Sequence, residues 1–101
     1  MKKLQKQVDE WVGRNAGYFK PHEILARLVE EVGELAREIN HKFGPKKKKS
    51  TEEVKELGDE MADIIFTLIC LANSQNINLD KHFDKMMQKL NSRDKDRWTK
   101  K

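Results

Sequence analysis

The stretch HEILARLVEEVGELAREINHK, residues 22–42, decides the fold. Its apolar residues recur every three or four positions, a spacing that places side chains on one face of an α-helix. That face consists of Ile24, Leu25, Leu28, Val32, Leu35 and Ile39. Phe43-Gly44-Pro45 then supplies a glycine and a proline that end a helix. The stretch therefore predicts a helix over residues 22–42.

Three further segments show helical spacing, at about residues 2–15, 51–73 and 79–92. Pro21 suits the first turn of the second helix. Ser50-Thr51-Glu52-Glu53 has the pattern of a capping box and predicts that the third helix starts at Thr51. No segment shows the alternating apolar pattern of a β-strand. We expect an all-α chain of four helices.

The length of 101 residues is that of one compact domain, so residues 1–101 are expected to form a single domain. Charged residues make up 38% of the chain and hydrophobic residues 37%, which makes the core of one copy thin. The third helix is apolar nearly all round from Ile64 to Ala72, and this predicts that it is buried on two sides. We expect the chain to form an oligomeric helical bundle, as a homodimer or a homotetramer.

The sequence also bears on location and on other function classes. The longest apolar stretch, Met61 to Ala72, is too short to cross a membrane, and the first residues lack the apolar region of a secretion signal. We therefore expect a cytoplasmic protein with no membrane partner. A pI of about 9.2 and the run Lys46 to Lys49 are compatible with a basic module that binds nucleic acid or protein, which is one alternative. Acidic stripes on the two central helices oppose nucleic acid as the partner.

Carboxylates form one stripe on each central helix, at helical spacing. The stripes consist of Glu31, Glu34 and Glu38 on the second helix, and of Glu56, Glu60 and Asp63 on the third. Like charges at this spacing repel each other, and Asp63 lies in an apolar run where an unpartnered carboxylate is costly to bury. The pairs Glu31/Glu34 and Glu60/Asp63, projecting from neighbouring helices, would make an all-oxygen cage. Mg²⁺ prefers such ligands.

Glu30-Glu31-Val32-Gly33-Glu34 is followed, after 25 residues, by Glu60-Met61-Ala62-Asp63. This pattern resembles the EExxE…ExxD signature of the MazG-type nucleoside triphosphate pyrophosphohydrolases, within the all-α NTP pyrophosphatase superfamily. The resemblance spans nearly the whole chain and is closest to the single-domain bacterial members. It implies cleavage of a (d)NTP between the α and β phosphates, with Mg²⁺ as cofactor and Mn²⁺ as a substitute. House-cleaning of aberrant nucleotides is a further hypothesis from the resemblance.

The resemblance assigns metal binding and catalysis, position by position, to Glu31, Glu34, Glu60 and Asp63. Supporting roles around these ligands are expected for Glu30, Glu38 and Glu56. The fourth helix and the tail after it carry a basic stripe that we expect to meet the phosphates, namely Lys85, Lys89 and Arg93. The resemblance implies the same role for Lys89, Asn91 and Arg93. Base recognition is expected from an aromatic residue, Trp11, Tyr18 or Phe19.

Phosphoribosyl-ATP pyrophosphohydrolase is the alternative within the superfamily. That family typically shows Ala-Asp-Leu-Leu-Tyr-His at the second motif. This chain has Ala62-Asp63-Ile64-Ile65-Phe66-Thr67 instead. The difference favours the MazG-type interpretation.

Overall fold

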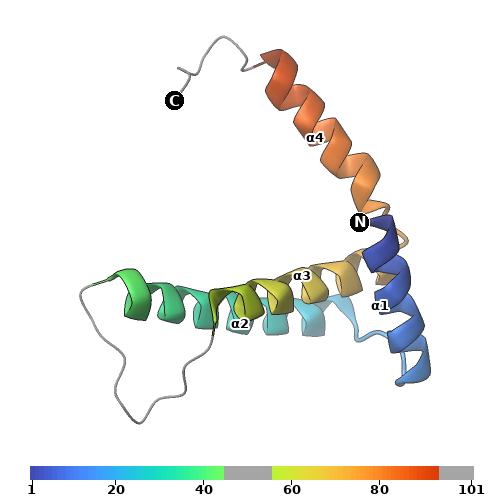
Figure 1. The fold of residues 1–101 in the computed structure, drawn as a ribbon. Helices are drawn as coiled ribbons and strands as arrows, with labels where there is room; N and C mark the ends of the chain where they lie inside the picture. Colours follow the sequence, from blue (N-terminus) through green and yellow to red (C-terminus); the bar gives the residue numbers. More distant parts are fainter. Residues whose placement is uncertain (45–55, 94–101) are drawn as a thin grey trace.

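The computed structural model describes residues 1–44 and 56–93, which form four α-helices and no strand (Figure 1). The helices are α1 (Lys2–Arg14), α2 (Pro21–Phe43), α3 (Leu57–Ser74) and α4 (Leu79–Arg93). The predicted all-α fold is confirmed. Helices α2 and α3 lie side by side and antiparallel, and α1 crosses the pair near the end of α3. Helix α4 leaves from the same end and projects away from the pair.

Local signals at both ends of α2 explain why the helix closely matches its prediction. Pro21 is its first residue, and the backbone N–H of Lys20 donates to Glu23 Oε1 at 3.1 Å. At the other end, the N–H of Gly44 donates to the carbonyl of Asn40 at 3.0 Å. A Cβ added at Gly44 would lie 2.7 Å from that carbonyl oxygen, so only glycine fits this close approach. These residues set the length of the helix that carries the first motif.

The predicted start of the third helix at Thr51 lies outside the described residues, but the predicted helix over residues 51–73 is wrong at residue 56. The helix begins at Leu57, and Glu56 before it is extended, with φ −74° and ψ 144°. Gly58 lies in the first turn, where glycine disfavours a helix by roughly 1 kcal/mol relative to alanine. Asp59 and Glu60 also lie in this turn, where negative charge is favourable. The capping box at residues 50–53 lies outside the described residues.

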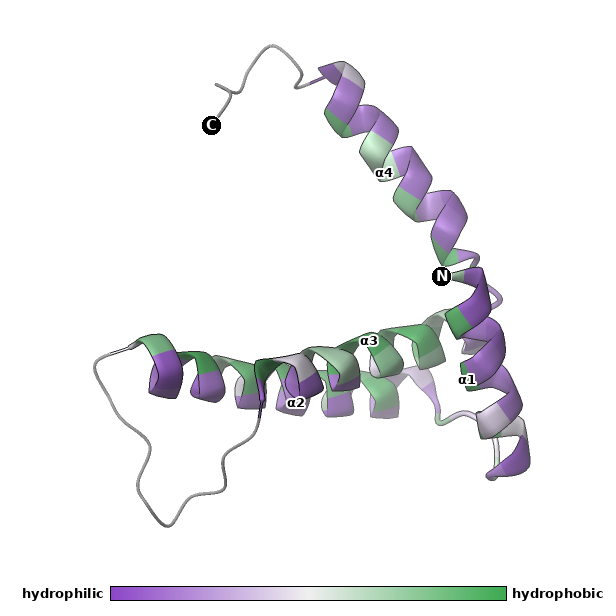
Figure 2. Cartoon of the chain, viewed as in Figure 1, coloured by the Kyte–Doolittle hydropathy of each residue, from purple (hydrophilic) through white to green (hydrophobic). Residues whose placement is uncertain are grey.

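The buried apolar core of the described part is small. Its buried side chains are Val12, Ile24, Ile69 and Ala72, which come from α1, α2 and α3. Figure 2 shows that α2 is hydrophobic toward α3, while the later turns of α3 are hydrophobic over most of the visible surface. Met61, Ile65 and Leu68 on α3 remain 43–53% exposed in the single chain. None of the helices described is long and apolar enough to span a membrane.

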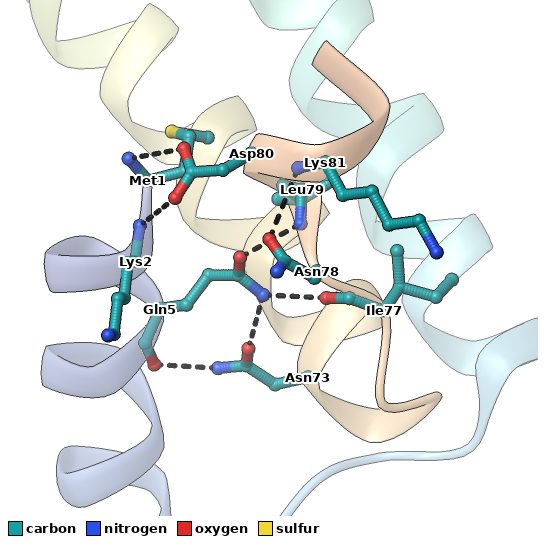
Figure 3. Close-up of polar contacts among 9 residues, drawn as sticks. All are labelled: Met1, Lys2, Gln5, Asn73, Ile77, Asn78, Leu79, Asp80 and Lys81. Carbon is teal, nitrogen blue, oxygen red and sulfur yellow. Dashed lines mark hydrogen bonds and ion pairs between the residues drawn. The ribbon is translucent and has the colours of Figure 1, made fainter. Parts of the chain in front are cut away.

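The amide of Gln5 ties α1 to the turn between α3 and α4 (Figure 3). Its Nε2 donates to Asn73 Oδ1 and to the carbonyl of Ile77, both at 2.9 Å. Its Oε1 accepts from the N–H of Leu79, the first residue of α4. Asn73 Nδ2 in turn donates to the Gln5 carbonyl at 2.9 Å. Because several bonds meet at one side chain, this junction sets where α1 lies on α3.

Candidate active site

Polar side chains are buried at the seam between α2 and α3. In the part of the chain that the structure describes, the buried polar residues are Glu31, Glu60 and Thr67, with 5%, 2% and 5% of each residue exposed. The hydroxyl of Thr67 on α3 donates a hydrogen bond to Glu31 Oε1 on α2. Burying a carboxylate without partners is costly, and this hydrogen bond offsets part of that cost.

The second oxygen of Glu31 has a basic neighbour on its own helix. Arg27 Nε lies 3.8 Å from Glu31 Oε2, an i,i+4 pair along α2. This distance is too long for a hydrogen bond, so the contact is a loose ion pair. The Arg27 side chain is 70% exposed and therefore free to turn toward a bound anion. The two oxygens of Glu31 thus have different surroundings, a hydroxyl at one and a guanidinium near the other.

An open groove of about 610 Å³ runs beside Glu31. Its polar wall contains carboxylates from both motifs, Glu31 and Asp63, together with Arg27 and Thr67. Aromatic rings complete it, namely those of Trp11, Phe19 and Phe66. Acidic, basic and aromatic side chains therefore line one groove, the combination that a metal–nucleotide complex requires.

The aromatic wall joins two helices. Trp11 on α1 and Phe66 on α3 meet edge to face, with ring centroids 5.9 Å apart and an interplanar angle of 78°. Trp11 is 51% exposed and Phe19 is 73% exposed, so both rings present surface to solvent. Tyr18 is held elsewhere, since its hydroxyl donates to Asp9 Oδ1 at 2.6 Å and accepts from Asn73 Nδ2 at 2.9 Å. Of the three candidate base-binding rings, Trp11 and Phe19 line the groove.

The four predicted ligands are spread along the seam. Glu31 and Asp63 line the groove together, Glu60 is buried one turn earlier on α3, and Glu34 is exposed on α2. Within residues 1–44 and 56–93, no three His, Cys, Asp or Glu side chains gather closely enough to hold one metal ion. The structure thus brings one carboxylate from each motif into the groove, without assembling the complete predicted cage.

The three residues predicted to support the ligands differ in burial. Glu30 and Glu56 are exposed, and Glu56 immediately precedes α3. Glu38 is half-buried. Because α2 and α3 are antiparallel with equal rise per residue, equal steps from the Glu31–Thr67 contact place Glu38 level with Glu60. Of the three, Glu38 is therefore the one best placed beside a predicted ligand.

The predicted phosphate-binding residues do not reach the groove within one chain. Lys85, Lys89, Asn91 and Arg93 are exposed on α4, and none of them lines the groove. Helix α4 projects away from the α2–α3 pair (Figure 1). In the described part of a single chain, the groove takes its basic side chain from Arg27 instead.

Sequence reasoning did not identify Arg27 and Cys70 as residues that line the groove. Arg27 precedes Glu31 by four residues, and this i,i+4 spacing between opposite charges was the available signal. Cys70 is a free, half-buried thiol that also lines the groove. Burial raises its pKa, and the nearby charge of Glu31 raises that pKa further. The thiol therefore stays protonated and behaves as a small, weakly polar side chain.

Comparison with known proteins agrees with this geometry. A family model for the MazG nucleotide pyrophosphohydrolase domain matches residues 19–98. The chain belongs to the MazG nucleotide pyrophosphohydrolase family. YpjD of Bacillus subtilis strain 168 is 52% identical over 102 residues, which cover 100% of this chain and 92% of that protein.

Two solved structures share the fold. The crystal structure of YpjD from Bacillus subtilis aligns with a TM-score of 0.81 at 48% identity, covering 90% of this chain and 94% of that one. The crystal structure of a Bacillus-conserved MazG protein, described as a nucleotide pyrophosphohydrolase, aligns with a TM-score of 0.77 at 45% identity. That alignment covers 94% of this chain and 93% of the other. The chain is thus an enzyme of the nucleotide pyrophosphohydrolase class.

MazG pyrophosphohydrolases generally depend on a divalent metal, and the residues at the seam fit one in their chemistry. The candidate donors are carboxylate oxygens, which hard cations prefer over nitrogen or sulfur. Two of them, Glu31 and Glu60, are buried acids at the seam. A cation would compensate such buried negative charge.

Proposed function

We propose that the chain is a Mg²⁺-dependent nucleoside triphosphate pyrophosphohydrolase that cleaves a (d)NTP between the α and β phosphates. The products are the (d)NMP and pyrophosphate. The observation that carries this proposal is the groove in which Glu31 and Asp63 face the same space as Trp11 and Phe19. Hydrolysis of aberrant nucleotides is the biological role we propose for this activity.

Each wall of the groove has a part in the proposed reaction. Glu31, Glu34, Glu60 and Asp63 would hold Mg²⁺, which supplies charge neutralisation for the triphosphate and activation of a water molecule. Trp11 and Phe19 would stack on the base, because their exposed rings offer the apolar surface of the groove. Arg27 would meet phosphate oxygens with its guanidinium, for which its planar geometry is suited.

Product analysis tests the reaction. The purified protein is incubated with Mg²⁺ and a panel of canonical and modified NTPs and dNTPs, with phosphoribosyl-ATP included for the alternative pyrophosphohydrolase. Monophosphate plus pyrophosphate, lost with EDTA, supports the proposal and ranks the substrates. Formation of nucleoside diphosphate and phosphate would mean cleavage between the β and γ phosphates, and this would contradict the proposal. No turnover of any substrate, combined with tight binding of nucleic acid, would favour the basic binding module instead.

Two substitutions test the ligand set. Asp63→Asn and Glu34→Gln each remove one negative charge with little change of shape. We expect turnover to be abolished while the helical circular dichroism signal stays intact. Retained activity in either variant would remove that residue from the ligand set.

We also propose that the chain works as a homodimer or homotetramer in the cytoplasm, with residues 1–101 as a single domain. Exposed Met61, Ile65 and Leu68 support association, because they leave an apolar face of α3 in water. Analytical ultracentrifugation at micromolar concentration tests this. A folded monomer at that concentration would contradict the proposed assembly.

A further inference from the structure

We infer that Thr67 is a positioning residue, which holds Glu31 by its Oε1 so that Oε2 alone is offered to a metal ion. This inference rests on the proposed metal-dependent function and adds to it a residue outside the EExxE and ExxD motifs. Its basis is the hydrogen bond that crosses the seam between two buried side chains.

The position of Thr67 on α3 gives the first step. Thr67 follows Asp63 by four residues, so the two side chains lie on the same face of the helix. Both line the groove beside Glu31. Helix α3 thus contributes a carboxylate and, one turn later, a hydroxyl to the same site.

The chemistry of the hydroxyl gives the second step. A threonine hydroxyl has a single proton, and here Thr67 donates it to Glu31 Oε1. A threonine in a helix has two favoured χ1 rotamers, and the hydrogen bond to Glu31 selects the one that directs the hydroxyl across the seam. Thr67 is only 5% exposed, which leaves little access for water to replace this donor. The bond therefore restricts the orientation of the carboxylate.

The surroundings of Oε2 give the third step. That oxygen lies 3.8 Å from Arg27 Nε, beyond hydrogen-bonding distance, and the Arg27 side chain is 70% exposed. A mobile guanidinium can move aside for a cation, whereas the buried hydroxyl at Oε1 cannot. Glu31 is thereby prepared for coordination through one oxygen.

Isothermal titration with Mn²⁺ tests the inference, using wild-type protein, Thr67→Val and Thr67→Ser. Valine keeps the shape of threonine and lacks the hydroxyl, while serine keeps the hydroxyl. Loss of a partner that orients a metal ligand typically weakens metal affinity by roughly 10- to 100-fold, which is the range we expect for Thr67→Val. Thr67→Ser should restore most of the affinity. Ile69→Val, a buried change on the same helix, is the control and should bind Mn²⁺ like the wild type.

A kinetic readout separates positioning from simple loss of stability. Turnover of Thr67→Val should recover substantially as the metal concentration rises, because the defect is in metal affinity. If Thr67→Val does not fold by circular dichroism, Thr67→Ala serves as a second variant without the hydroxyl. Unchanged Mn²⁺ affinity in a folded hydroxyl-free variant overturns the inference. Absence of Mn²⁺ binding to the wild type would instead overturn the proposed metal dependence, and the inference with it.

Discussion

Trp11 on α1 meets Phe66 on α3 edge to face, with ring centroids 5.9 Å apart. The contact holds one side of the Trp11 ring against the bundle, while half of the residue stays exposed at the groove. An aromatic ring supported in this way loses little conformational freedom when a base stacks on it. This relationship makes Trp11 the strongest candidate for base binding.

Replacing Trp11 by alanine should weaken nucleotide binding more than it slows the chemical step. A base–aromatic stack contributes roughly 1–3 kcal/mol, so we expect KM to rise by about 10-fold or more in Trp11→Ala. Steady-state kinetics with the best substrate measures this change. Leu4→Ala removes an exposed apolar side chain from the same helix outside the groove, and its KM should stay near wild type. If the KM of Trp11→Ala also stays near the wild-type value, Trp11 does not bind the base.

The adjacent pair Glu30 and Glu31 offers a test with a matched control. Glu30 is exposed, whereas Glu31 is 5% exposed and lines the groove. Consecutive residues on a helix point about 100° apart, so only Glu31 faces the seam. We expect Glu31→Gln to lower kcat/KM by at least about 100-fold and Glu30→Gln by less than about 3-fold. A comparable loss in both variants would mean that the first motif acts through its total charge.

These two residues also show how far sequence reasoning reaches. The helical period placed Glu30 and Glu31 on different sides of α2, and the structure agrees because both ends of that helix carry strong local signals in Pro21 and Gly44. The period also placed Asp63 on the stripe of α3 that reaches the groove. Periodicity is a property of one helix, and on α2 it placed Ile24 and Glu31 on the buried side. Leu25, Val32 and Ile39 of the predicted apolar face are nevertheless 42–59% exposed in the single chain, and no residue of α4 is buried.

Relations between helices were harder to predict. The hydrogen bond from Thr67 to Glu31 depends on how α2 and α3 align, which no local pattern determines. The basic residues on α4 were expected at the phosphates, but the direction of α4 is set by the turn that Gln5 holds. The helix predicted over residues 51–73 is also not helical at Glu56, which is extended. Contacts between segments far apart in the sequence decided the first two of these features.

Arg27 should bind phosphate, and its contribution can be compared with that of α4. A charge-assisted hydrogen bond contributes about 1.5–3 kcal/mol, so Arg27→Gln should raise KM for a triphosphate by about 10-fold or more. Lys89→Gln provides the comparison, since Lys89 does not line the groove in the chain. Kinetics at saturating Mg²⁺ keep metal affinity out of the measurement. A large effect of Lys89→Gln with none of Arg27→Gln would indicate that α4 of another subunit supplies the positive charge.

The junction at Asn73 should be a major source of stability. Its side chain makes three hydrogen bonds of 2.9 Å, to the Gln5 amide, the Gln5 carbonyl and the Tyr18 hydroxyl. Asn73→Ala leaves part-buried partners unsatisfied, so we expect the free energy of unfolding to fall by about 2–3 kcal/mol. Urea denaturation at fixed protein concentration measures it. Gln75→Ala, an exposed change nearby, should stay within about 0.5 kcal/mol of wild type.

The hydroxyl of Tyr18 should lose its proton at a higher pH than that of an ordinary tyrosine. Burial first, and then its hydrogen bond to Asp9, raise the pKa of Tyr18 from 10.0 to about 12. The folded state therefore holds the phenolic proton more tightly than the unfolded state. Between pH 10 and about 12 the unfolded chain binds fewer protons at this site, so the stability due to Tyr18 is fully present below pH 10 and is lost as pH rises through this window.

The chain contains a single tyrosine, so tyrosinate absorbance reports on Tyr18 alone. The titration midpoint of the folded protein should lie well above 10.0 and near the value of about 12. Asp9→Asn should lower that midpoint, because it removes the negative charge beside the hydroxyl. The stability of Tyr18→Phe should fall less than that of wild type over the same alkaline range. A midpoint near 10.0 in the folded wild type would show that the Asp9–Tyr18–Asn73 chain of hydrogen bonds does not hold in solution.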